Sequence, residues 1–225
     1  CRIFTGARVP QGALSILPQE EAQVQGGLVI SSGPTVKGSH IRRQGEEMAA
    51  GACLLEAGTI ITPGILGALA SQGLAQVRAS VPLRVTLIST GTEIVPPGQP
   101  LTGSNVYESN SWSIVSDLTS SGHEVIHHMV RDDGDSIKTA LKDAALSSDL
   151  VLTIGGISVG DYDLVGPSFE SIGGRIIFRG VKMKPGKPVS FGTLPAGRLW
   201  FGLPGNPMSC WTTYCLFVRS LWSQG

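Results

Sequence analysis

The stretch LVLTIGGISVGDYD, residues 150–163, decides how the C-terminal part of the chain folds. Its opening residues, 150–154, are apolar or β-branched and predict a strand, and the glycine-rich residues after them lead into a helix expected at 164–172. A strand, a glycine-rich turn and a helix form the repeating unit of layered α/β proteins. This stretch therefore predicts a mostly parallel sheet with helices packed against it.

The same alternation extends from residue 83 to the end of the chain. The other expected strands lie at residues 84–89, 124–129, 175–181, 188–191 and 199–203, and the other expected helices at 111–121, 136–146 and 207–221. Most of these helices follow an Asn, Asp or Ser, whose side-chain oxygen caps a helix N-terminus. We therefore predict a three-layer α/β/α domain over residues 83–225.

The first 82 residues show a different pattern. Short β-like segments at 14–17, 28–31 and 52–55 are separated by glycines, and one helix is expected to begin at Pro63. Val81-Pro82 marks the expected boundary, because proline disfavours helix at the residue before it. We predict a smaller, mostly β domain over residues 1–82.

Composition excludes several classes of protein. With 41% hydrophobic and 15% charged residues among 225, the chain can bury one substantial core or two small ones. Seventeen basic and seventeen acidic residues give a formal net charge of +0, so no overall field favours nucleic acid or an anionic membrane. No apolar stretch approaches the roughly 20 residues that span a bilayer. We expect neither nucleic-acid binding nor a membrane span.

The cysteines Cys1, Cys53, Cys210 and Cys215 contain no CxxC pair, and the last two lie off one another's helical face. We interpret them as reduced thiols of a cytoplasmic protein. The chain begins with Cys1 and shows no signal-peptide pattern. It is therefore expected to be a segment of a longer protein.

Polar residues and glycines follow several of the expected strands. Ligands of open α/β sheets bind in the crevice at these carboxyl ends of the strands. STGTE (89–93) follows one strand, RDD (131–133) another, GGISVGDYD (155–163) a third and the last strand ends in GLPGNP (202–207). Glycine-rich turns before helices bring backbone N–H groups close to a phosphate. Together these loops predict a site for a phosphorylated ligand.

Charged residues accompany these loops. KMKPGKP, residues 182–188, carries three lysines and predicts a local anion clamp. Glu93, Asp132 and Asp163 are expected at the same crevice, where a divalent cation, Mg²⁺, would relieve their repulsion with a phosphate. Alternatives remain open: Asp163 can simply cap its helix, the lysines can form a solvated hairpin, and the glycines a tight turn. Asp132-Asp133 can be a turn or a cap for the helix expected from Ser136, and Glu93 can face solvent.

Other motifs fail. GISVG (156–160) matches the G-x-S-x-G nucleophile elbow, but that fold requires a His after Ser158, and every histidine of the chain precedes it. The lysine-rich segment is no P-loop, because Pro188 stands where Ser or Thr should be. His127 and His128 are neighbours on an expected strand and point to opposite faces, which argues against a zinc site.

In order along the chain, the loops resemble the molybdopterin-binding domain of the molybdopterin molybdenumtransferase family, which comprises MoeA and the gephyrin E-domain. The matching segments are residues 89–93, the helix start at Asn110, residues 131–133 and 155–163, KPGKP (184–188) and GLPGNP (202–207). RIFTGA (2–7) and IRRQGEE (41–47) resemble that family's second, β-rich domain. The resemblance covers essentially the whole chain.

The resemblance implies the last step of molybdenum cofactor synthesis, in which adenylylated molybdopterin and molybdate give the cofactor and AMP with the help of Mg²⁺. It implies catalytic and metal-binding roles for Glu93, Asp132 and Asp163. The substrate-binding residues that it implies are Thr5, Glu47, Thr90, Gly91, Asn110, Gly155, Gly156, Ser158, Gly160, Lys184, Lys187, Pro204, Asn206 and Pro207. It also implies a homodimer, in which Thr5 and Glu47 complete the partner's pocket, and a possible molybdopterin adenylyltransferase partner.

Other functions remain open at this point. A gephyrin-like scaffold uses the same domain, and single-domain molybdopterin adenylyltransferases and competence-damage-type proteins share the GGxSxG…D loop. The β-rich N-terminal part and GLPGNP favour the transferase. Thr92, Glu47 and Leu164 replace residues common in the family, so a binding domain without insertase activity is a further alternative, and we expect the chain to carry the pterin-binding half.

Overall fold

The computed structural model describes residues 1–157 and 163–222. The chain divides into two compact units, Cys1–Thr59 and Ile60–Gly225. The domain boundary expected at residue 82 stays a prediction. No helix in the described part of the chain is long and apolar enough to cross a membrane.

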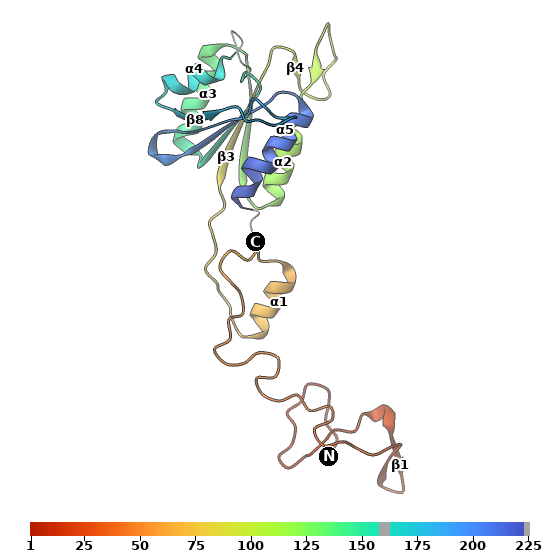
Figure 1. The fold of residues 1–225 in the computed structure, drawn as a ribbon. Coiled ribbons are helices and arrows are strands. Elements are labelled where there is room, and N and C mark those ends of the chain that lie inside the picture. The colour runs from red at the N-terminus through yellow and green to blue at the C-terminus, as the bar shows by residue number, and fades with distance from the viewer. Residues whose placement is uncertain (158–162, 223–225) are drawn as a thin grey trace. The chain divides into compact units, whose positions relative to one another are not determined.

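The first unit contains a 3₁₀ turn, η1 (Gln19–Glu21), and an antiparallel hairpin of β1 (Ala22–Gln25) and β2 (Leu28–Ser31) (Figure 1). The strand expected at 28–31 is confirmed. Its partner β1 was not predicted, although Gly26-Gly27, both with positive φ, is a typical two-residue hairpin turn.

The strands expected at residues 14–17 and 52–55 are wrong, because neither segment forms a strand. Residues 14–17 make isolated backbone hydrogen bonds, Gly38 N–H to Leu14 O and Ile16 N–H to Ser39 O, without a continuous ladder. Residues 52–55 are irregular, with a bend at Leu54 and Leu55. A β-like composition gives a strand only where a partner strand completes the hydrogen bonding.

The second unit is built on a six-stranded sheet with strand order β6-β3-β7-β10-β9-β8. β6, β3, β7 and β10 pair in parallel, whereas β9 is antiparallel to both of its neighbours, so the expected mostly parallel sheet is confirmed. The bounds are β3 Arg84–Thr90, β6 Glu124–Val130, β7 Leu150–Ile154, β8 Arg175–Arg179, β9 Ser190–Thr193 and β10 Leu199–Leu203. A short parallel pair, β4 (Ile94–Val95) and β5 (Val106–Tyr107), stands apart from this sheet and was not predicted.

Helices cover both faces of the sheet, which makes the expected three layers (Figure 1). α2 (Asn110–Ser120) and α5 (Pro207–Thr213) lie on one face, and α3 (Gly134–Ser147) and α4 (Val165–Ser171) on the other. A further helix, α1 (Pro63–Ser71), begins at Pro63 as predicted, and the Thr62 hydroxyl accepts a hydrogen bond from the Ile65 N–H.

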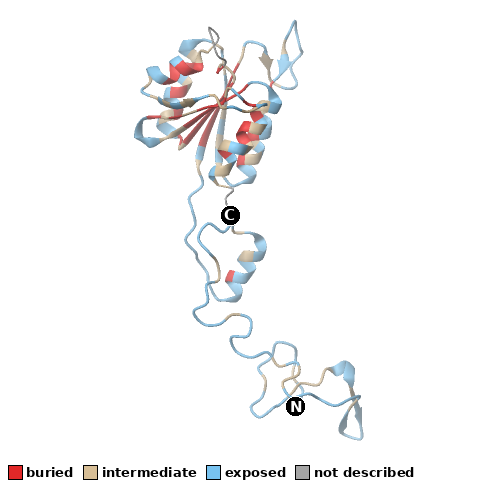
Figure 2. Ribbon diagram, in the orientation of Figure 1, coloured by how far each residue is buried: buried red, intermediate tan, exposed pale blue. Residues whose placement is uncertain are grey.

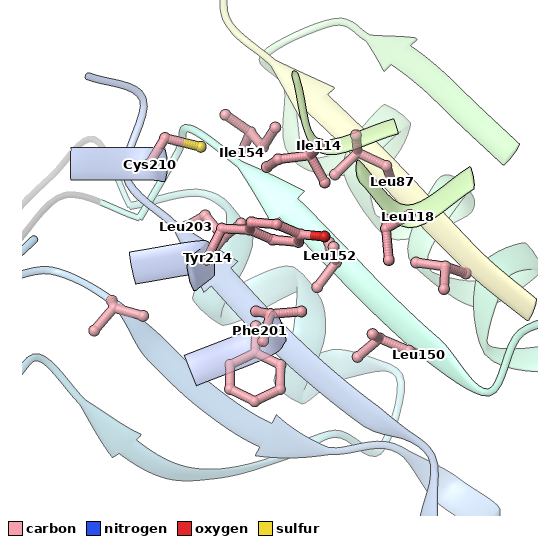
Figure 3. Close-up of a cluster of buried hydrophobic side chains, with 13 residues drawn as sticks. Leu87, Ile114, Leu118, Leu150, Leu152, Ile154, Phe201, Leu203, Cys210 and Tyr214 are labelled. Atoms are coloured by element: carbon pink, nitrogen blue, oxygen red, sulfur yellow. The ribbon is translucent and has the colours of Figure 1, made fainter. Parts of the chain in front are cut away.

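Alternation along the central strands divides the core into two clusters. Leu150, Leu152 and Ile154 point to the face of α2 and α5, whereas Val151 points to the face of α3 and α4. Figure 2 shows the buried residues on the central strands and on the helix sides that face them, and Figure 3 shows the first cluster around Tyr214. Helices on both faces explain why β7 is buried along its whole length and β3 is buried from Val85 onward.

The C-terminal helix, expected to run through residues 207–221, is not regular. After α5 the chain continues as a π turn (Tyr214–Val218) and a 3₁₀ turn (Arg219–Leu221). The Thr213 hydroxyl donates to Ser209 O at 2.8 Å and lies 3.0 Å from Cys210 O, so it competes for carbonyls of the α-helical ladder just where the ladder changes.

Candidate functional site

A cavity of about 450 Å³ opens at the carboxyl ends of β3, β7 and β10. From β3 the chain proceeds to β6 at one edge of the sheet, and from β7 it proceeds to β8 at the other edge. The connections that leave these two neighbouring strands therefore run in opposite directions. Such a switch in strand order leaves a crevice where ligands of α/β proteins bind. The predicted site residues that line the cavity are Thr90, Gly91, Glu93, Asn110, Asp132, Gly155, Gly156, Pro204, Asn206 and Pro207.

The glycine pair after β7 is required by a close approach of backbones. Gly155 and Gly156 have φ of +85° and +60°. A Cβ on Gly155 would lie 2.4 Å from Thr90 O, and one on Gly156 would lie 2.8 Å from Val165 Cγ2. These two glycines therefore form a tight turn, as one of the two interpretations expected, and the same turn is part of the cavity wall.

Two of the predicted carboxylates, Glu93 and Asp132, line this cavity. The Thr90 hydroxyl donates to Asp132 Oδ1 at 2.8 Å, which ties the end of β3 to the loop after β6. Glu93 folds back over Gly91, where a Cβ would lie 2.8 Å from Oε2. Both acids line the cavity, as the sequence predicted for the ends of the strands.

The neighbouring acid, Asp133, has a different task. Its carboxylate accepts hydrogen bonds from the backbone N–H and the hydroxyl of Ser136, each at 2.8 Å, and caps α3. These hydrogen bonds, the backbone one first, hold the pKa of Asp133 below its ordinary value. Of the adjacent pair, Asp132 faces the cavity and Asp133 stabilises the helix.

The loop after β10 is tied to the start of α2. Asn110 Nδ2 donates to Gly205 O at 2.7 Å. Asn206 accepts from the Ser209 N–H at 3.3 Å and caps α5. The Asn110 amide therefore joins two walls of the cavity, and the Asn206 amide orders the start of α5 in one of them.

Sequence reasoning missed Glu108, a carboxylate that is 3% exposed and lines the same cavity. Its Oε1 accepts from the Ser111 N–H at 2.9 Å, and its Oε2 bonds the Ser111 hydroxyl. The signal that could have found it is its position three residues before Ser111, where an acid can satisfy a helix N-terminus. The Glu108 charge acts against the burial that lowers the pKa of His127, and adds to the burial that raises the pKa of Cys210 to about 12.

A second cavity, of about 720 Å³, shares Ile157 and Pro188 with the first. Its charged lining residues are Asp163, Arg179, Lys182 and Lys187. Lys184 is exposed and lies outside this lining. Asp163 accepts from the Gly166 N–H at 2.9 Å, in the first turn of α4, and from Arg179 Nη1 at 2.6 Å, so both of its oxygens are engaged.

The predicted metal ligands are thus divided between two cavities. Within residues 1–157 and 163–222, no three His, Cys, Asp or Glu side chains are grouped closely enough to hold a metal ion. Glu93 and Asp132 share the first cavity, and Mg²⁺ is commonly held by one or two carboxylates together with water and substrate phosphates. These two acids fit Mg²⁺, whereas Asp163 is engaged by Arg179.

The remaining predicted residues lie elsewhere. Ser158 and Gly160 fall outside the described residues. Thr5 and Glu47 belong to the first unit and are exposed; Thr5 lines a cavity of about 790 Å³ there, and Glu47 pairs with Arg42 at 2.5 Å. The cysteines are free thiols, as expected.

Two family models match the chain. One is described as a probable molybdopterin binding domain and matches residues 86–223; the other, the MoeA N-terminal region (domain I and II), matches residues 1–73. Molybdopterin molybdenumtransferase 2 of Mycobacterium tuberculosis is 38% identical over 224 residues, which cover 97% of this chain and 55% of that protein. The molybdopterin molybdenumtransferase of Haemophilus influenzae is 36% identical over 223 residues, with 98% and 54% covered.

Solved structures agree with these matches. A molybdopterin biosynthesis MoeA protein from Pyrococcus horikoshii aligns with a TM-score of 0.73 and 28% identity over 97% of this chain and 52% of that one. The chain spans about half the length of the curated relatives it matches.

Proposed function

Because the chain belongs to the molybdopterin molybdenumtransferase family, we propose that it binds adenylylated molybdopterin and takes part in the Mg²⁺-dependent insertion of molybdate with release of AMP. The observation that carries this proposal is the pair of adjoining cavities at the carboxyl ends of the strands. One presents the carboxylates Glu93 and Asp132, and the other presents Lys182 and Lys187 beside the ion pair of Arg179 and Asp163. The phosphates of the pterin and of the adenylate need positive charge, and the carboxylates would act on them through a bridging cation.

Each part of the site has a task in this proposal. The backbone at Gly155 and Gly156 approaches the ligand without side chains in the way, and Asn110 fixes the facing loop. Lys187 provides positive charge for phosphate oxygens, and Lys184, which is exposed outside the cavity, would turn towards the bound ligand. Pro204 and Pro207 shape the wall, and Asn206 orders the helix behind it.

Mg²⁺ would be held by Glu93 and Asp132 and would supply neutralisation of the charge on the phosphoanhydride. The Thr90 hydroxyl keeps one oxygen of Asp132 in place and leaves the carboxylate directed at the cavity. Asp163 would act from the neighbouring wall, where Arg179 orients its carboxylate beside the lysines.

The homodimer is part of the same proposal. Thr5 and Glu47 would complete the pocket of the partner subunit from the first unit, and a molybdopterin adenylyltransferase would deliver the substrate. The match of residues 1–73 to the MoeA N-terminal region favours this arrangement over the single-domain alternatives.

The test is molybdate-dependent AMP release from adenylylated molybdopterin in the presence of Mg²⁺. Asp132→Asn should lower the rate about a hundredfold, because the site loses one of the two carboxylates that would hold Mg²⁺ at the reacting phosphates. Asp133→Asn is the matched control: asparagine caps helices as well as aspartate does, so the rate should stay within about twofold. Equal rates for the two variants would contradict the role of Asp132.

Binding is measured in parallel through the fluorescence of the pterin. If the chain binds pterin but releases no AMP, it is the binding half of a larger enzyme and the activity proposed for the chain alone is wrong. If it neither binds pterin nor releases AMP, the whole proposal fails.

A further inference from the structure

The ion pair of Arg179 with Asp163 is a feature of the second cavity to which no site motif of the sequence pointed. Arg179 is the last residue of β8, and its Nη1 donates to Asp163 Oδ2 at 2.6 Å, whereas its Nη2 lies 3.4 Å from Glu170 Oε2. The side chain of Asp163 is 16% exposed and that of Glu170 is 55% exposed. The short, charge-assisted hydrogen bond therefore goes to the more buried carboxylate, and the Glu170 contact is a weak surface pair.

Gly166 makes room for this contact. A Cβ on Gly166 would lie 2.6 Å from Nη2 and 2.7 Å from Nη1 of Arg179, so the guanidinium lies directly against the backbone of α4. The Gly166 N–H itself donates to the other oxygen of Asp163. One carboxylate oxygen is thus held by the helix backbone and the other by a side chain that the same glycine admits.

We propose that Arg179 is a positioning residue that fixes the Asp163 carboxylate at the wall of the second cavity, with Gly166 providing the space it occupies. The guanidinium is planar and carries several donors, and it is anchored to the end of a strand of the central sheet. It holds Asp163 where Lys182 and Lys187 line the same cavity. The consequence for turnover rests on the proposed function, but the orientation of the carboxylate does not.

The exchange rate of the Gly166 amide hydrogen, measured by NMR in the full chain, tests this positioning directly, because that N–H donates to Asp163. Arg179→Ala should speed its exchange, relative to the amides of β3, by about tenfold, because a charge-assisted hydrogen bond no longer fixes Asp163. Gly166→Ala should have the same effect at residue 166, because its methyl group displaces the guanidinium without removing any charge. The double variant should exchange no faster than either single variant, and Arg179→Lys should recover part of the protection.

Two controls separate this from a general effect. Glu170→Gln removes the weak partner of Arg179, and Gly67→Ala adds a methyl group to a helical glycine with nothing within 4 Å. Both should leave the exchange at Gly166 unchanged. Wild-type protection in Arg179→Ala and in Gly166→Ala would overturn the proposal.

AMP release gives the second readout. Arg179→Ala should lower kcat about tenfold and change the KM for the pterin less than about threefold, and lysine should restore part of kcat. An unchanged kcat in a variant whose Gly166 exchange has risen would overturn the role in turnover. A wild-type chain without AMP release would contradict the proposed function, and the exchange measurement would then decide the positioning role by itself.

Discussion

At the scale of single residues, Gly155 shows how backbone geometry builds the site. Its positive φ and the short approach to Thr90 O both exclude a side chain. We expect Gly155→Ala to lower the free energy of unfolding by about 1–3 kcal/mol from backbone strain, and further from the contact with Thr90 O. Urea unfolding followed by circular dichroism measures this change.

Gly122→Ala is the matched control, because Gly122 has the same φ of +85° and nothing within 4 Å of a Cβ. Gly122→Ala should therefore lose only the stability that backbone strain costs. If the two variants lose equal stability, the steric contact at Gly155 has no energetic consequence.

At the scale of elements, a buried hydroxyl joins the two helices on one face of the sheet. Tyr214, fully buried at the end of α5, donates to Asp117 Oδ2 of α2 at 2.8 Å. Burial, followed by this hydrogen bond, raises the pKa of Tyr214. Tyr214→Phe should lower the free energy of unfolding by about 1–2 kcal/mol, because the partly buried Asp117 carboxylate loses this donor and Arg219, at 3.5 Å, is a weaker partner.

Thermal unfolding of Tyr107→Phe provides the comparison, since its hydroxyl bonds Gln99 O in an exposed loop. That variant should melt at the wild-type temperature. A Tyr214→Phe variant with the same melting temperature would show that α2 and α5 are held by apolar packing alone.

At the scale of the whole molecule, the second unit should lose stability in acid through one identifiable pair. Arg84 donates to both oxygens of Asp149 at the amino ends of β3 and β7, and these hydrogen bonds lower the pKa of Asp149 to about 2. Because the folded-state pKa is the lower one, this contribution is present above pH 4 and is lost between pH 4 and pH 2. The pair is largely exposed, so solvent screening keeps the effect small.

Asp149→Asn should therefore flatten the fall in the urea midpoint between pH 4 and pH 2 and lower the midpoint slightly at pH 7. A wild-type slope in this variant would assign the acid sensitivity to other groups.

The sequence by itself determined the fold class, the succession of the central strands and helices along the chain, and the family, which the comparisons confirm. Apolar alternation, capping residues and glycines are local signals, and they specify local backbone structure wherever packing agrees with them. They failed at residues 14–17 and 52–55, where no neighbouring strand completes a ladder. They also failed at the end of α5, where Thr213 competes for the helix carbonyls.

Only the tertiary structure decided which side chains meet. Asn110 and Gly205 are 95 residues apart in the chain, and Arg179 reaches Asp163 from the end of β8, so neither contact has a signature in local sequence. The same holds for the burial of Glu108 and for the division of the acids between two cavities. Sequence patterns record how each element folds and which face it buries, whereas the distances between side chains of different elements arise when those elements pack.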